Sequence, residues 1–152
     1  MTDLPQTGRC RCGATEITVT AAPIMTAACH CTGCQRMSAS AFSLTAMFPA
    51  AAIAVTKGQT VIGGAGSDLL AHHCCPACMT WMFTRITGMD FVNVRPTMFD
   101  VPDWATPFIE TMTDESLPWA RTPARHRFAG FPPQAEFMGL MEAYATRAGG
   151  AG

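Results

Sequence analysis

Residues 29–34 read Cys29-His30-Cys31-Thr32-Gly33-Cys34, so three cysteines and a histidine fall within six residues. Apolar packing does not require such a density of sulfur. Thiolates that converge on one point repel each other unless a cation lies between them, and a metal ion is such a cation. A tetrahedral zinc takes four ligands, whereas this stretch supplies three sulfurs. The sequence therefore predicts a metal site here and leaves its fourth ligand open.

Four of the remaining cysteines form two further close pairs, Cys10/Cys12 and Cys75/Cys78. A C-x-C pair and a distant C-x-x-C pair together predict a closed, structural four-sulfur zinc site. Cys74 stands beside the second pair, and we interpret it as a small buried hydrophobic residue. The alternative is that Cys74 is an extra ligand or a redox thiol.

The three-cysteine stretch has two further interpretations besides an open site. An open fourth position is typical of catalytic zinc, where water or substrate binds. In the first alternative, one of four nearby residues closes the site: His30, His72, His73 or Cys74. His30 lies between two ligands and should project away, which makes His73 the better candidate. In the second alternative, the stretch holds no metal and forms a disulfide when it is oxidised.

Alternating apolar residues predict a mainly β fold. We expect strands over residues 14–20, 42–49, 67–74, 80–86 and 90–95. Residues 52–56 and 60–62 flank Lys57-Gly58-Gln59 and predict a hairpin. Residues 96–133 are rich in proline and aromatic side chains, and we expect them to wrap over the core.

The C-terminal part of the chain has a different period. Phe137, Leu140, Met141 and Tyr144 recur at the spacing of one helix face, after Pro132-Pro133 and before a glycine pair. The pattern predicts a helix over residues 134–148 that packs its apolar stripe on the sheet.

Composition narrows the classes of function. A chain of 152 residues suits one domain, and a net charge of -1 without a basic run argues against nucleic acid or an anionic membrane as partner. No apolar stretch approaches the length of a membrane span, and residues 1–5 do not read as a signal peptide. We therefore expect a cytoplasmic protein, where eight cysteines indicate metal or thiol chemistry more than disulfides.

The cysteine motifs occur in an order that resembles a known family. Gly8-Arg9-Cys10-Arg11-Cys12-Gly13, then the stretch 29–34 followed by Gln35-Arg36, then Cys75-Pro76-Ala77-Cys78 are similar to the glutathione-dependent formaldehyde-activating enzyme family, to which centromere protein V is related. Residues 95–102, Pro107-Phe108-Ile109 and Pro118-Trp119 resemble the closing segment of that family. The resemblance covers roughly residues 5–133.

The resemblance implies a fold and a set of metal ligands. The fold is a β-tent of antiparallel sheets with zinc knuckles over residues 5–133, with the helix 134–148 packed on the same domain. Two zinc ions per chain are implied. A structural one is held by Cys10, Cys12, Cys75 and Cys78, and a catalytic one by Cys29, Cys31 and Cys34. The second zinc is expected to be lost more easily, because only three sulfurs hold it.

The implied activity is that of a carbon–sulfur lyase, which joins a glutathione-like thiol to a formaldehyde-like aldehyde. His73 and His30 are the candidates for proton transfer, or for hydrogen bonds that orient a metal ligand. Arg36, Arg85 and Arg95 are the candidates for binding the carboxylates of the thiol. The expected partners are small molecules, with a homodimer as one assembly to test. Two other interpretations are a non-catalytic zinc-binding interaction module and a thiol redox protein that uses Cys74.

Two positions depart from the family where it usually has glycine. Met79 follows the last cysteine, and Ala39 stands within Ser38-Ala39-Ser40 where family members have Ser-Gly-Ser. Glycine after the last cysteine permits a left-handed turn that lets backbone N–H groups reach the sulfurs. We expect a methionine in that conformation to cost about 1 kcal/mol.

Overall fold

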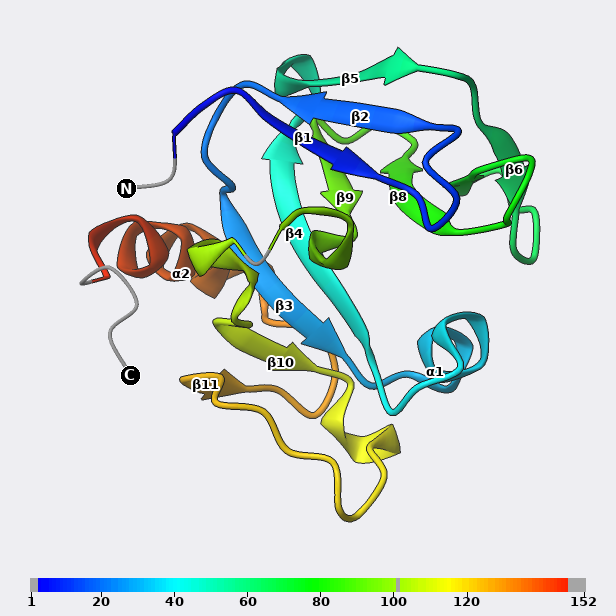
Figure 1. The fold of residues 1–152 in the computed structure, drawn as a ribbon. Helices are drawn as coiled ribbons and strands as arrows, with labels where there is room; N and C mark the ends of the chain where they lie inside the picture. The colour runs from blue at the N-terminus through cyan, green and yellow to red at the C-terminus, as the bar shows by residue number, and fades with distance from the viewer. Residues whose placement is uncertain (1–2, 101, 148–152) are drawn as a thin grey trace. The chain divides into compact units, whose positions relative to one another are not determined.

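The computed structural model describes residues 3–100 and 102–147, which form a mainly β protein (Figure 1). The helices are α1 (Thr32–Ser38), α2 (Gln134–Thr146) and the short 3₁₀ helices η1 (Ala50–Ala52), η2 (Pro96–Met98), η3 (Asp103–Ala105) and η4 (Thr113–Glu115). The strands are β1 (Gln6–Arg9), β2 (Glu16–Val19), β3 (Met25–Cys29), β4 (Ser43–Pro49), β5 (Ile53–Lys57), β6 (Val61–Gly63), β7 (Leu70–Cys74), β8 (Trp81–Ile86), β9 (Phe91–Val94), β10 (Ile109–Thr111) and β11 (His126–Arg127).

The chain divides into two compact units, and the first comprises residues 3–23 and 47–102. Its small sheet has the order β1-β2-β5, and both pairings are antiparallel. Strands β9, β8, β7 and β6 follow one another as antiparallel neighbours, with a bulge between His73 and Cys74. The turns β1–β2 and β7–β8 each carry one of the cysteine pairs.

The second unit comprises residues 24–46 and 103–147. Its centre is β3, whose first four residues are buried and whose neighbour β10 runs parallel to it. Strand β11 pairs with β10, also in parallel. Helix α1 begins just after β3 ends, so the three-cysteine stretch links a strand to a helix. Strand β4 belongs to both units, since residues 43–46 lie in the second and residues 47–49 in the first.

Each unit has an apolar interior. In the first unit the most deeply buried side chains come from β2, β4, β8 and β9: Ile17, Val19, Phe48, Met82, Phe83, Val92 and Val94. In the second unit Met25, Phe108 and Ile109 are buried with Leu140 and Tyr144 of α2. The rings of Phe108 and Tyr144 meet edge to face, with centroids 5.5 Å apart.

The mainly β class and the C-terminal helix are confirmed. Helix α2 runs from Gln134 to Thr146, and residue 148 of the predicted range lies outside the described residues. Of the predicted apolar stripe, Leu140 and Tyr144 are buried while Phe137 and Met141 are half-buried.

Other local predictions were wrong or incomplete. Residues 52–56 and 60–62 do not form a hairpin, because β5 pairs with β2 and β6 pairs with β7. Strands β1, β3, β10 and β11 and helix α1 were missed. The pairings of β10 are parallel, in contrast to the expected antiparallel sheets, and the long connection between β3 and β10 permits this direction.

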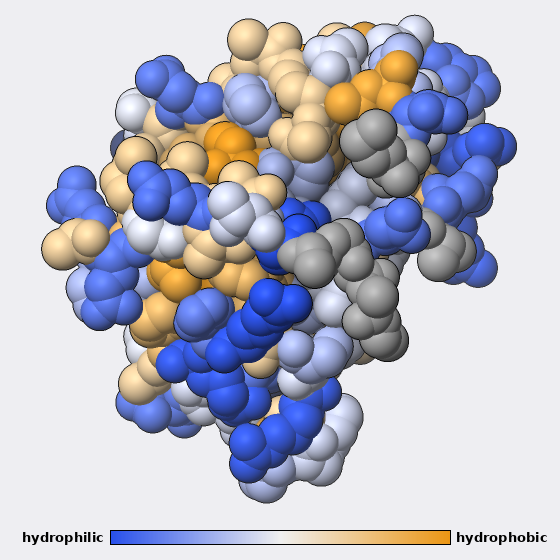
Figure 2. Space-filling model, turned by 90° about the vertical axis from the view of Figure 1, so that its left-hand side faces the viewer, coloured by the Kyte–Doolittle hydropathy of each residue, from blue (hydrophilic) through white to orange (hydrophobic). Residues whose placement is uncertain are grey.

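The surface is mixed in polarity. Large apolar side chains are exposed at separate places in both units, among them Ile62, Leu69, Trp119 and Phe131. Figure 2 shows one face of the molecule, on which small hydrophobic groups alternate with hydrophilic ones. Within residues 3–100 and 102–147, no helix combines the length and the apolar character that crossing a membrane requires.

We expect Gly58→Ala to lower the free energy of unfolding by at least about 2 kcal/mol. Gly58 has a φ of +67°, and a Cβ there would lie 2.3 Å from the backbone oxygen of Ala14. Gly66→Ala is the matched control, because Gly66 has a φ of +59° with nothing near its added Cβ. The control should lose about 1 kcal/mol in urea unfolding, and equal losses in both variants would contradict the close approach.

Candidate metal centres

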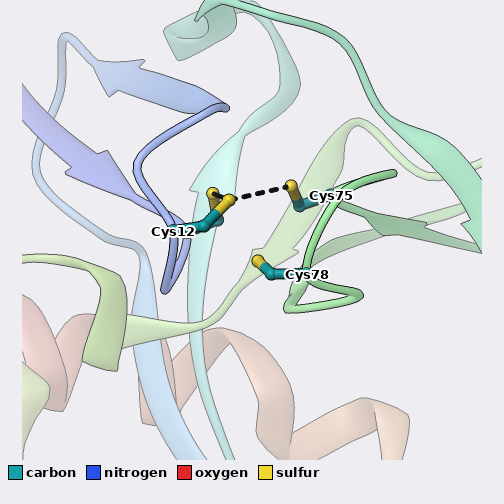
Figure 3. Close-up of side chains that lie close together, drawn as sticks. Cys12, Cys75 and Cys78 are labelled. Carbon is teal, nitrogen blue, oxygen red and sulfur yellow. Dashed lines mark hydrogen bonds between the residues drawn. The ribbon is translucent and has the colours of Figure 1, made fainter.

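Two turns of the first unit bring four cysteine sulfurs together (Figure 3). Cys10 and Cys12 lie on the turn between β1 and β2, and Cys75 and Cys78 lie on the turn between β7 and β8. Figure 3 labels three of them, Cys12, Cys75 and Cys78. All four sulfurs lie within 4.8 Å of one another. The Cys10 and Cys12 sulfurs are 3.6 Å apart, and the Cys12 and Cys75 sulfurs are 3.8 Å apart.

These distances fit a tetrahedral zinc. With Zn–S bonds near 2.3 Å, the sulfurs at two corners of a tetrahedron are about 3.8 Å apart. All eight cysteines are free, so no disulfide accounts for the approach of the sulfurs. The four-sulfur group has the donor set and the spacing of a closed structural zinc site.

Hydrogen bonds support the negative charge of these sulfurs. The backbone N–H of Thr15 donates to the Cys10 sulfur over 3.3 Å. The Thr80 hydroxyl lies 3.1 Å from the Cys78 sulfur, and its oxygen accepts from the backbone N–H of Arg11, also over 3.1 Å. The hydroxyl hydrogen is therefore left for Cys78, and this bond is the main reason that the pKa of Cys78 is lowered to about 5.

Cys74 is not part of the four-sulfur group. It is the last residue of β7 and only 5% exposed, and burial raises the pKa of its thiol. A Cβ on Gly63 of β6 would lie 2.8 Å from the Cys74 sulfur. The environment is that of a packed small side chain, as the sequence interpretation favoured.

Met79 and Ala39 both have left-handed backbone conformations. The φ angle of Met79 is 58° and that of Ala39 is 49°. The N–H of Met79 donates to the carbonyl of Cys75 over 2.9 Å, which closes the knuckle turn. Ala39 ends α1, and its N–H donates to the carbonyl of Gln35. At both positions, the family that the sequence resembles usually has glycine.

The second unit gathers the remaining three sulfurs, those of Cys29, Cys31 and Cys34, within 4.8 Å of one another. Cys29 ends β3, and Cys31 is the N-cap of α1. The Cys31 sulfur accepts the backbone N–H of Cys34 over 3.3 Å, so the first turn of the helix sets the distance between these two cysteines.

In the absence of metal, these sulfurs share protons. A hydrogen bond from the Cys34 thiol lowers the pKa of Cys29 to about 5, and the same bond raises the pKa of Cys34. One thiolate is thus favoured within the group at neutral pH. Three soft donors of this kind suit zinc, and binding it would release the remaining protons.

The segment 110–115 holds the three-cysteine stretch in place. The backbone N–H of His30 donates to the carbonyl of Thr111 over 3.0 Å. One carboxylate oxygen of Glu115 accepts the backbone N–H and the hydroxyl of Thr32, over 3.2 and 3.1 Å. The amide of Gln35 donates to the carbonyls of His30 and Glu115, over 2.7 and 2.9 Å. Hydrogen bonds from a segment about 80 residues further along the chain therefore hold His30, Thr32 and Gln35.

The side chain of His30 contacts a buried carboxylate and is not part of the three-sulfur group. Its Nε2 lies 2.9 Å from Oε1 of Glu110, and both side chains are fully buried. The other carboxylate oxygen of Glu110 accepts from Nη1 of Arg127. Sequence reasoning missed Glu110 and Arg127. The available signal was a single acidic residue directly after the apolar pair Phe108-Ile109.

A pocket of about 560 Å³ lies beside α1. Its lining is Gln35, Arg36, Ala39, Ser40, Ala41, Leu117 and Trp119. Arg36, one of the predicted substrate-binding residues, therefore lines this pocket. Gln35, which directly follows Cys34 in the sequence, lines it too. Trp119 is 74% exposed and gives the pocket an apolar face that a ligand can cover.

The other predicted site residues lie in the first unit. Nδ1 of His73 is 2.8 Å from the Thr60 hydroxyl, and its ring stacks on Phe83 with centroids 4.4 Å apart. Burial, and then the charges of Arg85 and His72, lower the pKa of His73, so the neutral ring is favoured. Arg95 lies over the Trp81 ring at 4.1 Å. A role for His73, Arg85 or Arg95 at the three-cysteine group stays a prediction.

The fold and the two sulfur groups together define a mainly β protein with two candidate metal centres. The sequence model of a family named "Glutathione-dependent formaldehyde-activating enzyme" matches residues 5–115. The chain belongs to this family, and the match includes every cysteine of both groups.

Solved structures support the fold. One similar structure is the crystal structure of a Rhodobacter sphaeroides protein, a structural-genomics target, with a TM-score of 0.53 and 20% sequence identity. The match covers 63% of this chain and 89% of that chain. No curated protein matches the sequence.

We expect Met79→Gly to raise the free energy of unfolding by about 1 kcal/mol, because glycine adopts the left-handed conformation without strain. Met79 is 57% exposed, so its side chain contributes little packing. The control is Met89→Gly, since Met89 is 52% exposed and has no positive φ. Chemical unfolding of the zinc-loaded variants should show a gain for the first and a loss for the second. A loss in both would contradict the strain at Met79.

Proposed function

We propose that this protein is a zinc-dependent lyase-type enzyme that joins a glutathione-like thiol to a small, formaldehyde-like aldehyde. The observation that carries the proposal is the contrast between the two sulfur groups of a chain in this family, one with four sulfurs and one with three. Three protein ligands leave a tetrahedral zinc one position for water or substrate, which distinguishes catalytic from structural sites.

Cys29, Cys31 and Cys34 would hold the catalytic zinc, and the four cysteines of the first unit would hold the structural one. When bound, zinc supplies a lowered pKa for a coordinated thiol and a positive charge for a developing oxyanion. The reaction breaks the S–H bond of the thiol and forms a bond from sulfur to the carbonyl carbon. The proton ends on the former carbonyl oxygen, so no oxidant or reductant is needed.

The chain's own residues would bind and orient the thiol. The guanidinium of Arg36 suits a carboxylate through paired hydrogen bonds, and the pocket beside α1 has the size of small-molecule sites. The exposed indole of Trp119 would be covered by the apolar part of the substrate. Of the two predicted histidines, His73 stays the candidate for carrying the proton, whereas the buried contact of His30 with Glu110 suits the alternative role of orienting the cysteines. Arg85 and Arg95 stay candidates for further carboxylate ligands. A reducing cytoplasm, where thiols stay free, fits the proposal, and a homodimer is an assembly to test.

The direct test is to count zinc per chain and to follow adduct formation from glutathione and formaldehyde against the uncatalysed rate. The proposal expects two zinc ions and an acceleration that Cys31→Ser removes together with one zinc. Cys74→Ala is the matched control, because Cys74 belongs to neither sulfur group, and this variant should keep both. Two zinc ions without acceleration for any thiol–aldehyde pair would refute the lyase and favour an interaction module. One zinc ion per chain would refute the zinc site at the three cysteines and favour a redox role for them.

Arg36→Gln should raise the KM for a thiol that carries carboxylates by about tenfold, with kcat little changed, because a charge-assisted bond of about 1.5 kcal/mol is lost. The control variant is Arg121→Gln, an exposed arginine of the same unit outside the pocket. The control substrate is an uncharged thiol, whose KM should not respond to Arg36→Gln. An equal rise for both thiols would show that Arg36 does not bind a carboxylate.

A further inference from the structure

A series of largely buried polar contacts connects β11 and β10 to the three-cysteine stretch. Glu110 is completely buried in β10 and contacts His30, which is also completely buried. Arg127, 34% exposed in its side chain, donates to the second oxygen of Glu110 from β11. This series of contacts therefore connects the partly exposed Arg127, through the buried carboxylate of Glu110, to His30 between Cys29 and Cys31.

Among residues 3–100 and 102–147, Glu110 is the side chain whose hydrogen bond orients the His30 ring. One oxygen of Glu110 is in hydrogen-bond contact with Nε2 of His30, and the other accepts from Nη1 of Arg127. Nδ1 of His30 is buried and has no hydrogen-bond partner among the described residues. The His30 ring also packs against Phe42, with centroids 5.2 Å apart. This apolar contact does not distinguish between the two ring orientations that differ by a half-turn and exchange the nitrogen positions.

The same strand also holds the backbone of the stretch. Glu110 pairs with Ala28 and Thr111 pairs with Cys29 in the parallel ladder between β10 and β3. The N–H of His30 then donates to the carbonyl of Thr111. Residues 28–30 are thus held by β10 through both their backbone and the His30 side chain.

Stability does not explain why this charge is buried. A buried ion pair is often no more stabilising than apolar side chains of the same volume, since both charges lose their water. Its best-attested use is to fix one arrangement among several. Here the arrangement that it fixes is the direction of the side chains at Cys29, His30 and Cys31.

The geometry points to Glu110, held by Arg127, as a positioning residue of the three-cysteine metal centre. Acting through His30, it keeps the Cys29 and Cys31 sulfurs aimed at one point. The inference rests on the proposed function in one respect, namely that the three cysteines bind zinc. It does not depend on the substrate.

The test is the zinc affinity of each centre in the full-length Glu110→Gln variant. Glutamine keeps the size of the side chain, but only one of its two terminal atoms is an acceptor, so it cannot hold both His30 and Arg127 as the carboxylate does. We expect zinc at the three-cysteine centre to bind about 10- to 100-fold more weakly, the usual effect of losing an outer-shell partner. The four-cysteine centre lies in the other unit and serves as an internal reference that should not change.

Competition with a chromophoric chelator measures both affinities, and the thiolate-to-Co²⁺ absorption of the cobalt-loaded chain reports the ligand geometry. Glu136→Gln is the matched control, because Glu136 is exposed on α2 of the same unit. In a His30→Gln background, Glu110→Gln should have little further effect if Glu110 acts through His30. Additive losses would overturn the inference, as would equal weakening of both centres or no weakening at all.

Failure of the inference and failure of the proposed function give different results. Two zinc ions with equal affinity in the wild type and the Glu110→Gln variant would overturn the inference alone. Selective weakening without any thiol–aldehyde acceleration would support the inference and refute the lyase. A wild-type chain that binds one zinc ion would overturn both.

Discussion

The need to hold negatively charged sulfurs close together accounts for most of the local structure around both cysteine groups. Sulfurs within 4.8 Å of each other repel when they are ionised, and hydrogen bonds and metal are the means of stabilising that charge. Turns place backbone N–H groups at the Cys10 and Cys31 sulfurs, and the Thr80 hydroxyl serves Cys78. The knuckle turn after Cys75 is closed by Met79 in a left-handed conformation. The strain at Met79 thus follows from the geometry that the sulfurs require.

The sequence predicted what close spacing determines. Cysteines two or three residues apart converge through local turns, so the pairs Cys10/Cys12 and Cys75/Cys78 and the stretch 29–34 could be recognised before the fold was known. That the two pairs, which are 63 residues apart, form one group was predicted from the combination of motifs, and distant parts of the fold bring it about. The alternating strand β2 and the apolar stripe of α2 were also predicted, because their periods are local. Strand β4 was predicted from alternating apolar residues, although residues 45–48 of it are all buried. The family match over residues 5–115 agrees with the motifs from which the resemblance was inferred.

Features that depend on distant partners could not be predicted. Nothing near Lys57 or Gly58 shows that β5 pairs with β2 and β6 with β7, so the local turn signal gave a hairpin that does not form. Strand β3 is almost wholly buried and lacks alternation, which removes the periodic signal. The partners of the three-cysteine stretch, Glu110, Thr111 and Glu115, follow it by about 80 residues, and no spacing rule connects them to it.

The two centres differ in the kind of support that surrounds them. The four-sulfur group is served by neutral donors on its own turns, as expected for a site that only has to stay closed. The three-cysteine stretch is held instead by the completely buried pair His30 and Glu110, whose burial is costly without such pairing, and by the partly exposed carboxylate of Glu115. A site with one ligand fewer has less intrinsic constraint on its geometry, so the surrounding protein has to supply more. Beside the three-sulfur group, the contacts of His30, Glu110 and Glu115 supply such constraint.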